Sequence, residues 1–207
     1  MTTYLDRDAI GRDVLRARMI PLLPAGLVKH IDRVVATAES LARRHGLDVE
    51  TTVLMAQAHD VLRATPAAEL LAEAERRRLP VNEAERSAPI LLHGPLGAIA
   101  LSERGWVRDP IVLHAVRFHT AGHPDLTPEG WAMVIADKIE PSKRRRWPAL
   151  EAVVEIAEYS LEIAALTYLD LLHAQGRRRG WVVDPAAETT RQALRERLGA
   201  SARSAAT

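Results

Sequence analysis

The sequence predicts an all-α fold, a bundle of roughly eight to ten helices. Apolar residues recur at helical spacing in most segments, and prolines, glycines and capping residues separate one segment from the next. No segment of useful length shows the alternating pattern of a β-strand. Aromatic residues make up only 4% of the chain, so the core must consist mostly of Leu, Ala, Val and Ile. This composition favours helices over strands.

In the first half of the chain, breaking and capping residues divide the apolar pattern into helices. Pro21 ends the first helix, and Gly46 stops the second. Thr65 and Pro66 are typical of an N-cap and the first helical residue, and Asn82 with Glu85 is typical of a capping pair. The expected helices span about 6–20, 27–45, 49–60 and 65–78, with a short turn from 82.

The second half repeats a proline signal at the start of its helices. Asp109, Thr127 and Asp184 each precede a proline, which suits an N-cap followed by the first helical residue. The expected helices span about 95–104, 110–118, 128–140, 148–174 and 185–198. Residues 199–207 are small and polar, and we expect them to form a disordered tail. No linker divides the chain, so residues 1–198 are expected to form one domain.

Composition excludes several classes of function. The chain has 28 basic and 27 acidic residues, so no global field attracts it to nucleic acid or to a membrane. It has no cysteine, which excludes disulfides, thiolate metal sites and a cysteine nucleophile. We find no signal-peptide pattern at the N-terminus and no apolar run near the roughly 18 residues of a membrane span. We therefore expect a cytoplasmic protein without a nucleic-acid or membrane partner.

An apolar helical run over residues 53–58 ends at a histidine that an aspartate follows directly, His59-Asp60. Imidazole nitrogen and carboxylate oxygen are both good ligands for a divalent transition metal. Adjacent helical residues point about 100° apart, so both side chains can border one site. By itself such a pair usually marks a helix surface or a helix end.

Further candidate ligands lie at the ends or inner edges of the expected helices. Together with the pair above, they are His30, His59, Asp60, His93, His119 and Asp137. Aspartate is rarely buried unless it is paired or bound to a metal, and both aspartates adjoin apolar runs. Such a set could hold two divalent metals with one carboxylate bridging them. Mixed nitrogen and oxygen ligands suit Fe, Mn, Zn or Co better than Mg.

A structural explanation competes with the metal hypothesis at each position. A single histidine beside an apolar stripe is more often a hydrogen-bonded core residue. We interpret His45, His114, His123 and His173 in that way, or as solvated side chains. Gly94 and Gly97 need only permit close packing of helices.

The order of the motifs distinguishes the two explanations. After His30 and His59-Asp60, the chain reads His-Gly-Pro-Leu-Gly-Ala from His93, His-Thr-Ala-Gly from His119 and Ala-Asp-Lys-Ile-Glu-Pro around Asp137. Over residues 27–172 this order resembles the HD-domain metal-dependent phosphohydrolases. Within them the chain is similar to the YqeK-like proteins, which are symmetrical diadenosine tetraphosphate hydrolases.

The resemblance implies an all-α HD-type domain and a metal-dependent hydrolase with a two-metal centre, most often iron, with Mn, Co and Zn as alternatives. It implies that one metal is held by His30, His59, Asp60 and Asp137. The second would be held by His93 and His119, with Asp60 bridging the two. A hydroxide between the metals would then attack phosphorus. Diadenosine tetraphosphate would be cleaved into two ADP.

The resemblance also implies roles for nearby residues. Asp60 and Arg63 are the expected catalytic residues, and the expected substrate-binding residues are Arg63, Thr120, Gly122, Lys138, Lys143 and Arg144. The chain departs from the family at three positions: Leu27 replaces a basic residue, Arg63 replaces lysine, and Lys143 replaces arginine. The last two substitutions keep the positive charge near a phosphate but change its geometry.

Two alternatives of other kinds remain open. One is a different HD-type nucleotide phosphohydrolase, such as a nucleotidase or a guanosine tetraphosphate hydrolase. The other is a non-catalytic helical scaffold in which the same six residues form a hydrogen-bonded core. The sequence leaves a homodimer open as well as a monomer.

Overall fold

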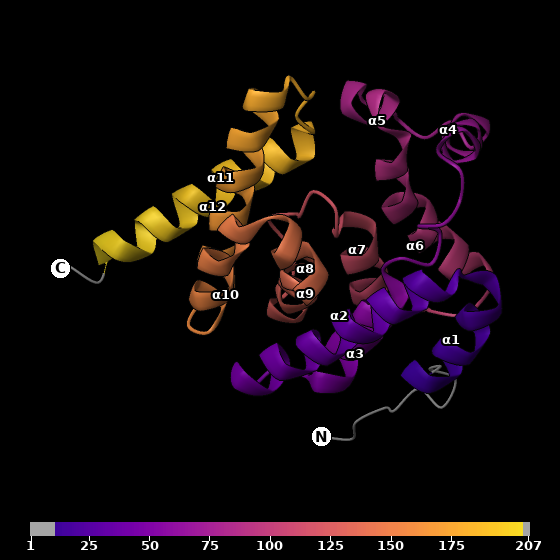
Figure 1. Cartoon of the computed structure of the whole chain (residues 1–207), viewed down its shortest axis with the longest axis horizontal. Coiled ribbons are helices and arrows are strands. Elements are labelled where there is room, and N and C mark those ends of the chain that lie inside the picture. The colour runs from indigo at the N-terminus through magenta and orange to yellow at the C-terminus, as the bar shows by residue number, and fades with distance from the viewer. Residues whose placement is uncertain (1–10, 205–207) are drawn as a thin grey trace.

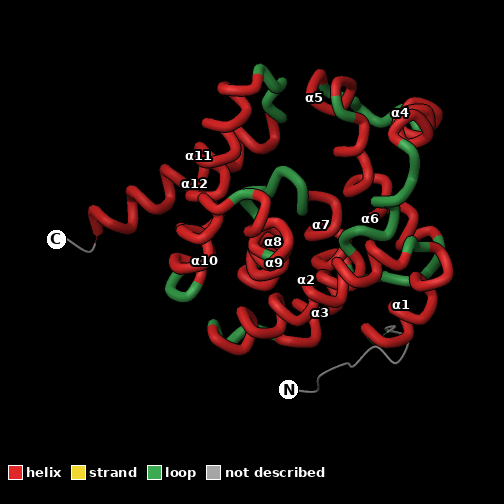
Figure 2. The backbone as a smooth tube through the Cα atoms, viewed as in Figure 1, coloured by secondary structure: helices red, strands yellow, loops and turns green. Residues whose placement is uncertain are grey.

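The computed structural model describes residues 11–204, with side chains described through residue 200. Within this part of the chain there are twelve α-helices, three short 3₁₀-helices and no strand (Figure 2). The predicted all-α class is confirmed, although the number of helices exceeds the eight to ten expected. None of the helices in residues 11–204 combines the length and the apolarity needed to cross a membrane.

The core is organised around α8 (Pro128–Ile139), every residue of which is buried from Gly130 to Ile139. α8 packs against α2 (Ala25–Arg44), α3 (Val49–Ala58) and α11 (Leu161–Arg179). In Figure 1 it lies near the centre of the molecule, with α2 and α3 below it in the view. Because α8 has no exposed face, a polar side chain on it must find its partner inside the protein.

Two further layers flank this centre. α6 (His93–Glu103) packs against α7 (Pro110–Phe118), and α1 (Arg12–Met19) packs on α3. A second small apolar cluster joins α4, η2 and α6 through Leu70, Ala74, Leu92 and Leu96. The remaining elements are η1 (Ile20–Leu22), α4 (Ala67–Arg76), α5 (Glu83–Ser87), η2 (Pro89–Leu92), α9 (Pro141–Arg146), η3 (Pro148–Leu150), α10 (Glu151–Ala157) and α12 (Pro185–Ser204).

Several predicted helix starts are confirmed by side-chain hydrogen bonds. The Asn82 side chain accepts a hydrogen bond from the Glu85 N–H, and the Glu85 side chain accepts one from the Asn82 N–H, which completes a capping box. Asp109 accepts a hydrogen bond from the backbone N–H of Ile111, and Thr127 accepts one from the N–H of Gly130. Asp184 likewise accepts from the N–H of Ala186.

Other boundaries differ from the prediction. Pro66 is itself the N-cap, with ψ 137°, so α4 begins at Ala67 rather than after a Thr65 cap. α6 begins at His93, two residues before Pro95. The long helix expected over 148–174 is interrupted, because Ser160 has an extended φ of −152° and accepts a hydrogen bond from the N–H of Ile163 to start α11. The Glu140 side chain caps the additional helix α9.

The ends of the chain also differ from expectation. α12 continues past Leu198 to Ser204, so the structure places residues 199–204 in a helix rather than in the expected disordered tail. Residues 6–10 of the first expected helix and residues 205–207 of the tail lie outside the described residues.

Candidate metal centre

Four helix ends converge on one point inside the protein. His59 is the C-cap of α3 and His119 that of α7, while His93 begins α6 and Asp137 lies two residues from the end of α8. His30, in the second turn of α2, and Asp60, directly after α3, complete the group. The structure thus brings together all six residues that the sequence named as candidate ligands. His30 is half-buried and the other five are buried.

The Asp60 carboxylate lies between two pairs of histidines. Its Oδ2 atom is 3.5 Å from His30 Nε2 and 3.4 Å from His59 Nε2. Its Oδ1 atom is 3.1 Å from His93 Nε2 and 3.6 Å from His119 Nε2. Each oxygen therefore faces a different pair, which is the arrangement that a bridging carboxylate requires.

Asp137 supplies a second carboxylate to only one of these pairs. Its Oδ1 atom is 3.2 Å from His30 Nε2 and 3.7 Å from His59 Nε2. The potential ligand atoms form two groups, each with all members within 4.8 Å of one another: His30, His59 and Asp137, and Asp60, His93 and His119. The division agrees with that expected from the sequence, with Asp60 adjoining both groups.

Three of the histidines are oriented by their own helices. His59 Nδ1 and His119 Nδ1 each lie 2.7 Å from the carbonyl oxygen three residues earlier, and His93 Nδ1 makes the same contact. A carbonyl only accepts, so in each ring Nδ1 donates the proton. Neutral rings in this tautomer present an Nε2 lone pair to the cluster, which is the form that binds a metal.

The arrangement of the donor atoms in the cluster suits a bound cation better than it suits hydrogen bonds among these atoms. His93 Nε2 and His119 Nε2 are 2.9 Å apart, although both Nδ1 atoms already hold a proton toward a carbonyl. Two lone pairs at this separation repel unless a proton or a cation lies between them. His59 Nε2 is buried and has no hydrogen-bond partner among the described residues, which is rare for a polar atom. The set of nitrogen and oxygen donors fits two divalent transition metals.

The charges in the cluster keep both carboxylates ionised. Burial would raise the pKa of Asp60, but the imidazoles of His59, His119 and His93 hold it well below its usual value. Burial opposes ionisation of Asp137 too, and Lys138 and Lys143 keep its pKa well below the usual range. Burial lowers the pKa of His59, but Asp60 and Asp137 raise it to about 10. A metal must displace that proton, so metal binding should weaken as the pH falls.

The expected substrate-binding residues occupy different environments. Lys138 Nζ is 2.8 Å from Asp137 Oδ2, and Lys143 Nζ contacts Asp137 Oδ1, so both cations lie at the cluster. Arg144 instead forms a two-point ion pair with Glu151 at 2.8 and 3.0 Å. Arg63 is exposed, and within residues 11–204 its side chain has no hydrogen bond or ion pair.

The two remaining expected residues follow His119 in the loop before α8. Thr120 is half-buried beside the cluster. Gly122 is buried with φ +74°, and a Cβ atom there would lie 3.0 Å from Thr190 Cγ2 and 3.1 Å from the ring of Trp131. The structure therefore explains Gly122 by backbone conformation and packing rather than by contact with a ligand. Leu27, where the family has a basic residue, is half-buried and packs on the core.

One site residue, Glu140, was not assigned a role from the sequence. Glu140 has no exposed surface, and its Oε2 atom accepts a hydrogen bond of 2.8 Å from Arg33 Nε. Its Oε1 atom lies 3.8 Å from His30 Nδ1, and the backbone N–H groups of Ser142 and Lys143 both donate to this carboxylate. Burial opposes ionisation, but the bonds from Ser142 and Arg33 lower the pKa of Glu140 to about 2. Glu140 thus faces the ring of His30 from outside the cluster and fixes the start of α9.

Comparison with known proteins agrees with this geometry. Residues 27–142 match the family described as HD domain. The chain is 32% identical over 137 residues to a Bacillus subtilis protein named bis(5'-nucleosyl)-tetraphosphatase, symmetrical, covering 66% of this chain and 72% of that one. A Halalkalibacterium halodurans protein of the same name is 32% identical over 149 residues, covering 72% and 78%.

A solved structure shows the same fold. It is the crystal structure of a predicted HD superfamily hydrolase involved in NAD metabolism from Clostridium acetobutylicum, with a TM-score of 0.81 and 24% identity. The match covers 89% of this chain and 97% of that one. The resemblance inferred from the motifs is confirmed: the chain belongs to the HD-domain family and, within it, to the YqeK-like group of symmetrical bis(5'-nucleosyl)-tetraphosphatases.

Proposed function

We propose that this protein is a metal-dependent phosphohydrolase that cleaves dinucleoside polyphosphates, above all diadenosine tetraphosphate, symmetrically into two ADP. The observation that carries the proposal is the position of Asp60, whose two carboxylate oxygens face two different pairs of buried histidines. The relatives named above support the choice of substrate. A buried structural ion pair would not need four imidazoles around one carboxylate.

The cluster would hold two divalent transition metals, and we propose iron, with Mn, Co or Zn as alternatives. His30, His59 and Asp137 would hold one, His93 and His119 the other, and Asp60 would contact both. When bound, such metals lower the pKa of water and neutralise charge on phosphoryl oxygens. Asp60 is the catalytic residue of the chain in this proposal, because the reaction takes place between the two groups it joins.

The basic residues would hold the phosphates. Lys138 and Lys143 place two ammonium groups at Asp137, on the edge of the cluster. Arg63 follows the cluster residue Asp60 by three positions and extends into solvent, where it can reach a phosphate. Arg144 is paired with Glu151, outside the cluster, whereas the partner of both lysines is the cluster residue Asp137, so Arg63 and the lysines are the stronger candidates. Charge-assisted bonds to phosphate are typically worth about 1.5–3 kcal/mol each.

The test is product analysis with diadenosine tetraphosphate and the metal-loaded protein. We expect ADP as the single nucleotide product, whereas asymmetric cleavage would give ATP and AMP, and chromatography separates them. Diadenosine diphosphate and AMP should be hydrolysed far more slowly, because they engage fewer of the basic side chains. Arg63→Ala should weaken binding of diadenosine tetraphosphate more than binding of the shorter nucleotides. The difference between their rates of hydrolysis should then become smaller.

Arg18→Ala is a suitable control for Arg63→Ala, because Arg18 is exposed on α1, outside the cluster. The proposal would be wrong if nucleoside monophosphates or guanosine tetraphosphate were the preferred substrates and Arg63→Ala left the ranking unchanged. In that case the chain would be another nucleotide phosphohydrolase of the HD family. Absence of any hydrolysis together with absence of bound metal would instead indicate a non-catalytic scaffold.

A further inference from the structure

A cavity of about 580 Å³ lies between α5, the loop from α7 to α8, and the facing parts of α11 and α12. We propose that it binds one nucleoside of the dinucleoside polyphosphate while the phosphates lie at the cluster. The inference rests on the proposed function and adds the location of the nucleoside. The volume falls in the range of small-molecule sites, about 300–1,000 Å³.

The cavity adjoins the cluster through three separate segments. Leu91, in one wall, is two residues before His93, and Thr120 and Ala121, in another, directly follow His119. Successive Cα atoms are about 3.8 Å apart, so these walls lie within roughly 8 Å of the Cα atoms of the two histidines. In the third wall, Leu169 follows Tyr168, over whose ring Lys138 Nζ lies at 5.8 Å from the centroid. None of the six cluster residues lines the cavity, but these adjacencies place it close enough for one dinucleoside polyphosphate to span both.

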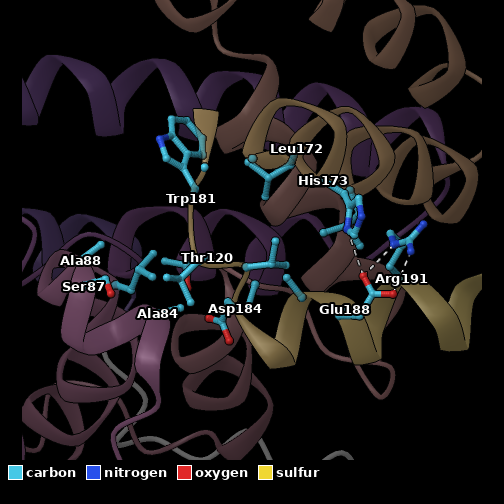
Figure 3. A pocket seen from close by; sticks show the side chains of 18 residues that line it. Ala84, Ser87, Ala88, Thr120, Leu172, His173, Trp181, Asp184, Glu188 and Arg191 are labelled. Atoms are coloured by element: carbon cyan, nitrogen blue, oxygen red, sulfur yellow. Dashed lines mark hydrogen bonds and ion pairs between the residues drawn. The ribbon is translucent and has the colours of Figure 1, made fainter. Parts of the chain in front are cut away.

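The lining suits a base and a ribose better than it suits phosphate. Figure 3 shows the small side chains of Ala84, Ser87 and Ala88, in α5 and directly after it, on one side, Leu172 on the other and the indole of Trp181 above them in the view. Trp181 lines the cavity and is 48% exposed. The Arg179 guanidinium lies over its ring at 5.3 Å from the centroid, so a base would stack on the opposite face. Apolar walls with a few polar groups are typical of nucleoside-sized sites.

The charged groups lie at the α12 end of the cavity. Arg191 forms an ion pair of 2.8 Å with Glu188, and Asp184 adds a second carboxylate to the lining (Figure 3). His173 Nδ1 is buried and has no hydrogen bond within the described residues, although it is 3.2 Å from Glu188 Oε2. Carboxylates repel phosphate but accept hydrogen bonds from ribose hydroxyls and amino groups. This end of the cavity is therefore suited to the neutral part of the substrate.

Adenosine binding to the metal-loaded protein tests the inference directly, because adenosine has no phosphate to bind at the cluster or to be hydrolysed. Calorimetry should give a dissociation constant of about 1 mM or tighter, as expected for a ligand of this size. Ser87→Trp fills the cavity from the exposed end of α5, and Leu172→Trp fills it from α11. Each should weaken adenosine binding at least about tenfold. Ser102→Trp is the matched control, because Ser102 is exposed on α6 away from the cavity, and it should bind as the unmodified protein does.

Kinetics separate failure of this inference from failure of the proposed function. If diadenosine tetraphosphate gives ADP, the two filling variants should raise KM about tenfold or more while their metal content stays unchanged. Unchanged KM and unchanged adenosine binding in both folded variants would overturn the cavity assignment and leave the function standing. Failure of the unmodified protein to bind adenosine would overturn it too. A third outcome is that the filling variants lose adenosine binding while the unmodified protein does not hydrolyse the tetraphosphate. That outcome would support the cavity assignment and contradict the proposed function.

Discussion

Asp60→Ala is expected to lower kcat/KM for diadenosine tetraphosphate by at least about a thousandfold, equivalent to roughly 4 kcal/mol of transition-state stabilisation. The variant should also retain less metal than His93→Ala. Asp60 Oδ1 and Oδ2 face both groups of potential ligands, whereas His93 belongs to one group only. The measurement combines steady-state kinetics with elemental analysis of each purified variant.

His114→Ala is the matched control for this prediction. The His114 ring makes edge-to-face contacts with Phe118 and His123, each with a centroid distance of 4.9 Å. His114 is near His119 in sequence but outside the cluster. The variant should keep the metal content of the unmodified protein. If Asp60→Ala and His93→Ala each lost one metal to the same extent, Asp60 would not bridge. Loss of metal in a folded His114→Ala variant would show that the wrong histidine had been assigned.

Gly94→Ala is expected to destabilise the protein by about 1–3 kcal/mol, because it overpacks a closed contact. A Cβ atom at Gly94 would lie 2.9 Å from the carbonyl oxygen of Arg117 and 3.2 Å from that of Val116. The second carbonyl also accepts the hydrogen bond from His119 Nδ1, so the last turn of α7 must move with its candidate ligand. Urea unfolding in the presence of a chelator measures the effect without a contribution from bound metal.

Gly97→Ala on the same helix provides the control. Its added Cβ would be 3.2 Å from Val61 Cγ1, a side-chain atom that can move, rather than from a carbonyl. Both substitutions gain about 1 kcal/mol in helix propensity, so the difference between them isolates the packing cost. We expect Gly94→Ala to be the less stable of the two. Equal stability would mean that α6 and α7 separate easily, and that Gly94 is not required for their close approach.

The all-α class could be predicted because the helix caps that the sequence indicates are also formed in the folded protein. Asp109 and Thr127 form the caps that their position before proline suggested. The break at Ser160 was not recognised because α10 and α11 both pack on α8, so the apolar pattern continues across it. Periodicity reports which face is buried, and it does not show that two successive helices bury their faces against the same partner.

The six candidate ligands could be named from their residue types and their order. Four of them follow or begin a helix, and His30 and Asp137 lie within the second and the last turn of theirs. Their distances could not be predicted, because these depend on how α2, α3, α6, α7 and α8 pack. Glu140 was overlooked since an acidic residue before proline resembles a solvated helix start. Its burial depends on Arg33, 107 positions away in the chain. The cavity could not be predicted from the motifs, because apart from Leu91, Thr120 and Ala121 its walls come from α5, α11, α12 and the segments that adjoin them.

Elemental analysis of the full chain, purified without chelator, tests most directly whether the His and Asp cluster is a two-metal centre. The account predicts about two transition metals per chain, one for each group of ligands. It predicts a loss of both in the presence of a strong chelator and their return when Fe, Mn or Co is supplied. A protein that is folded but binds no metal after refolding with each of these ions would contradict it.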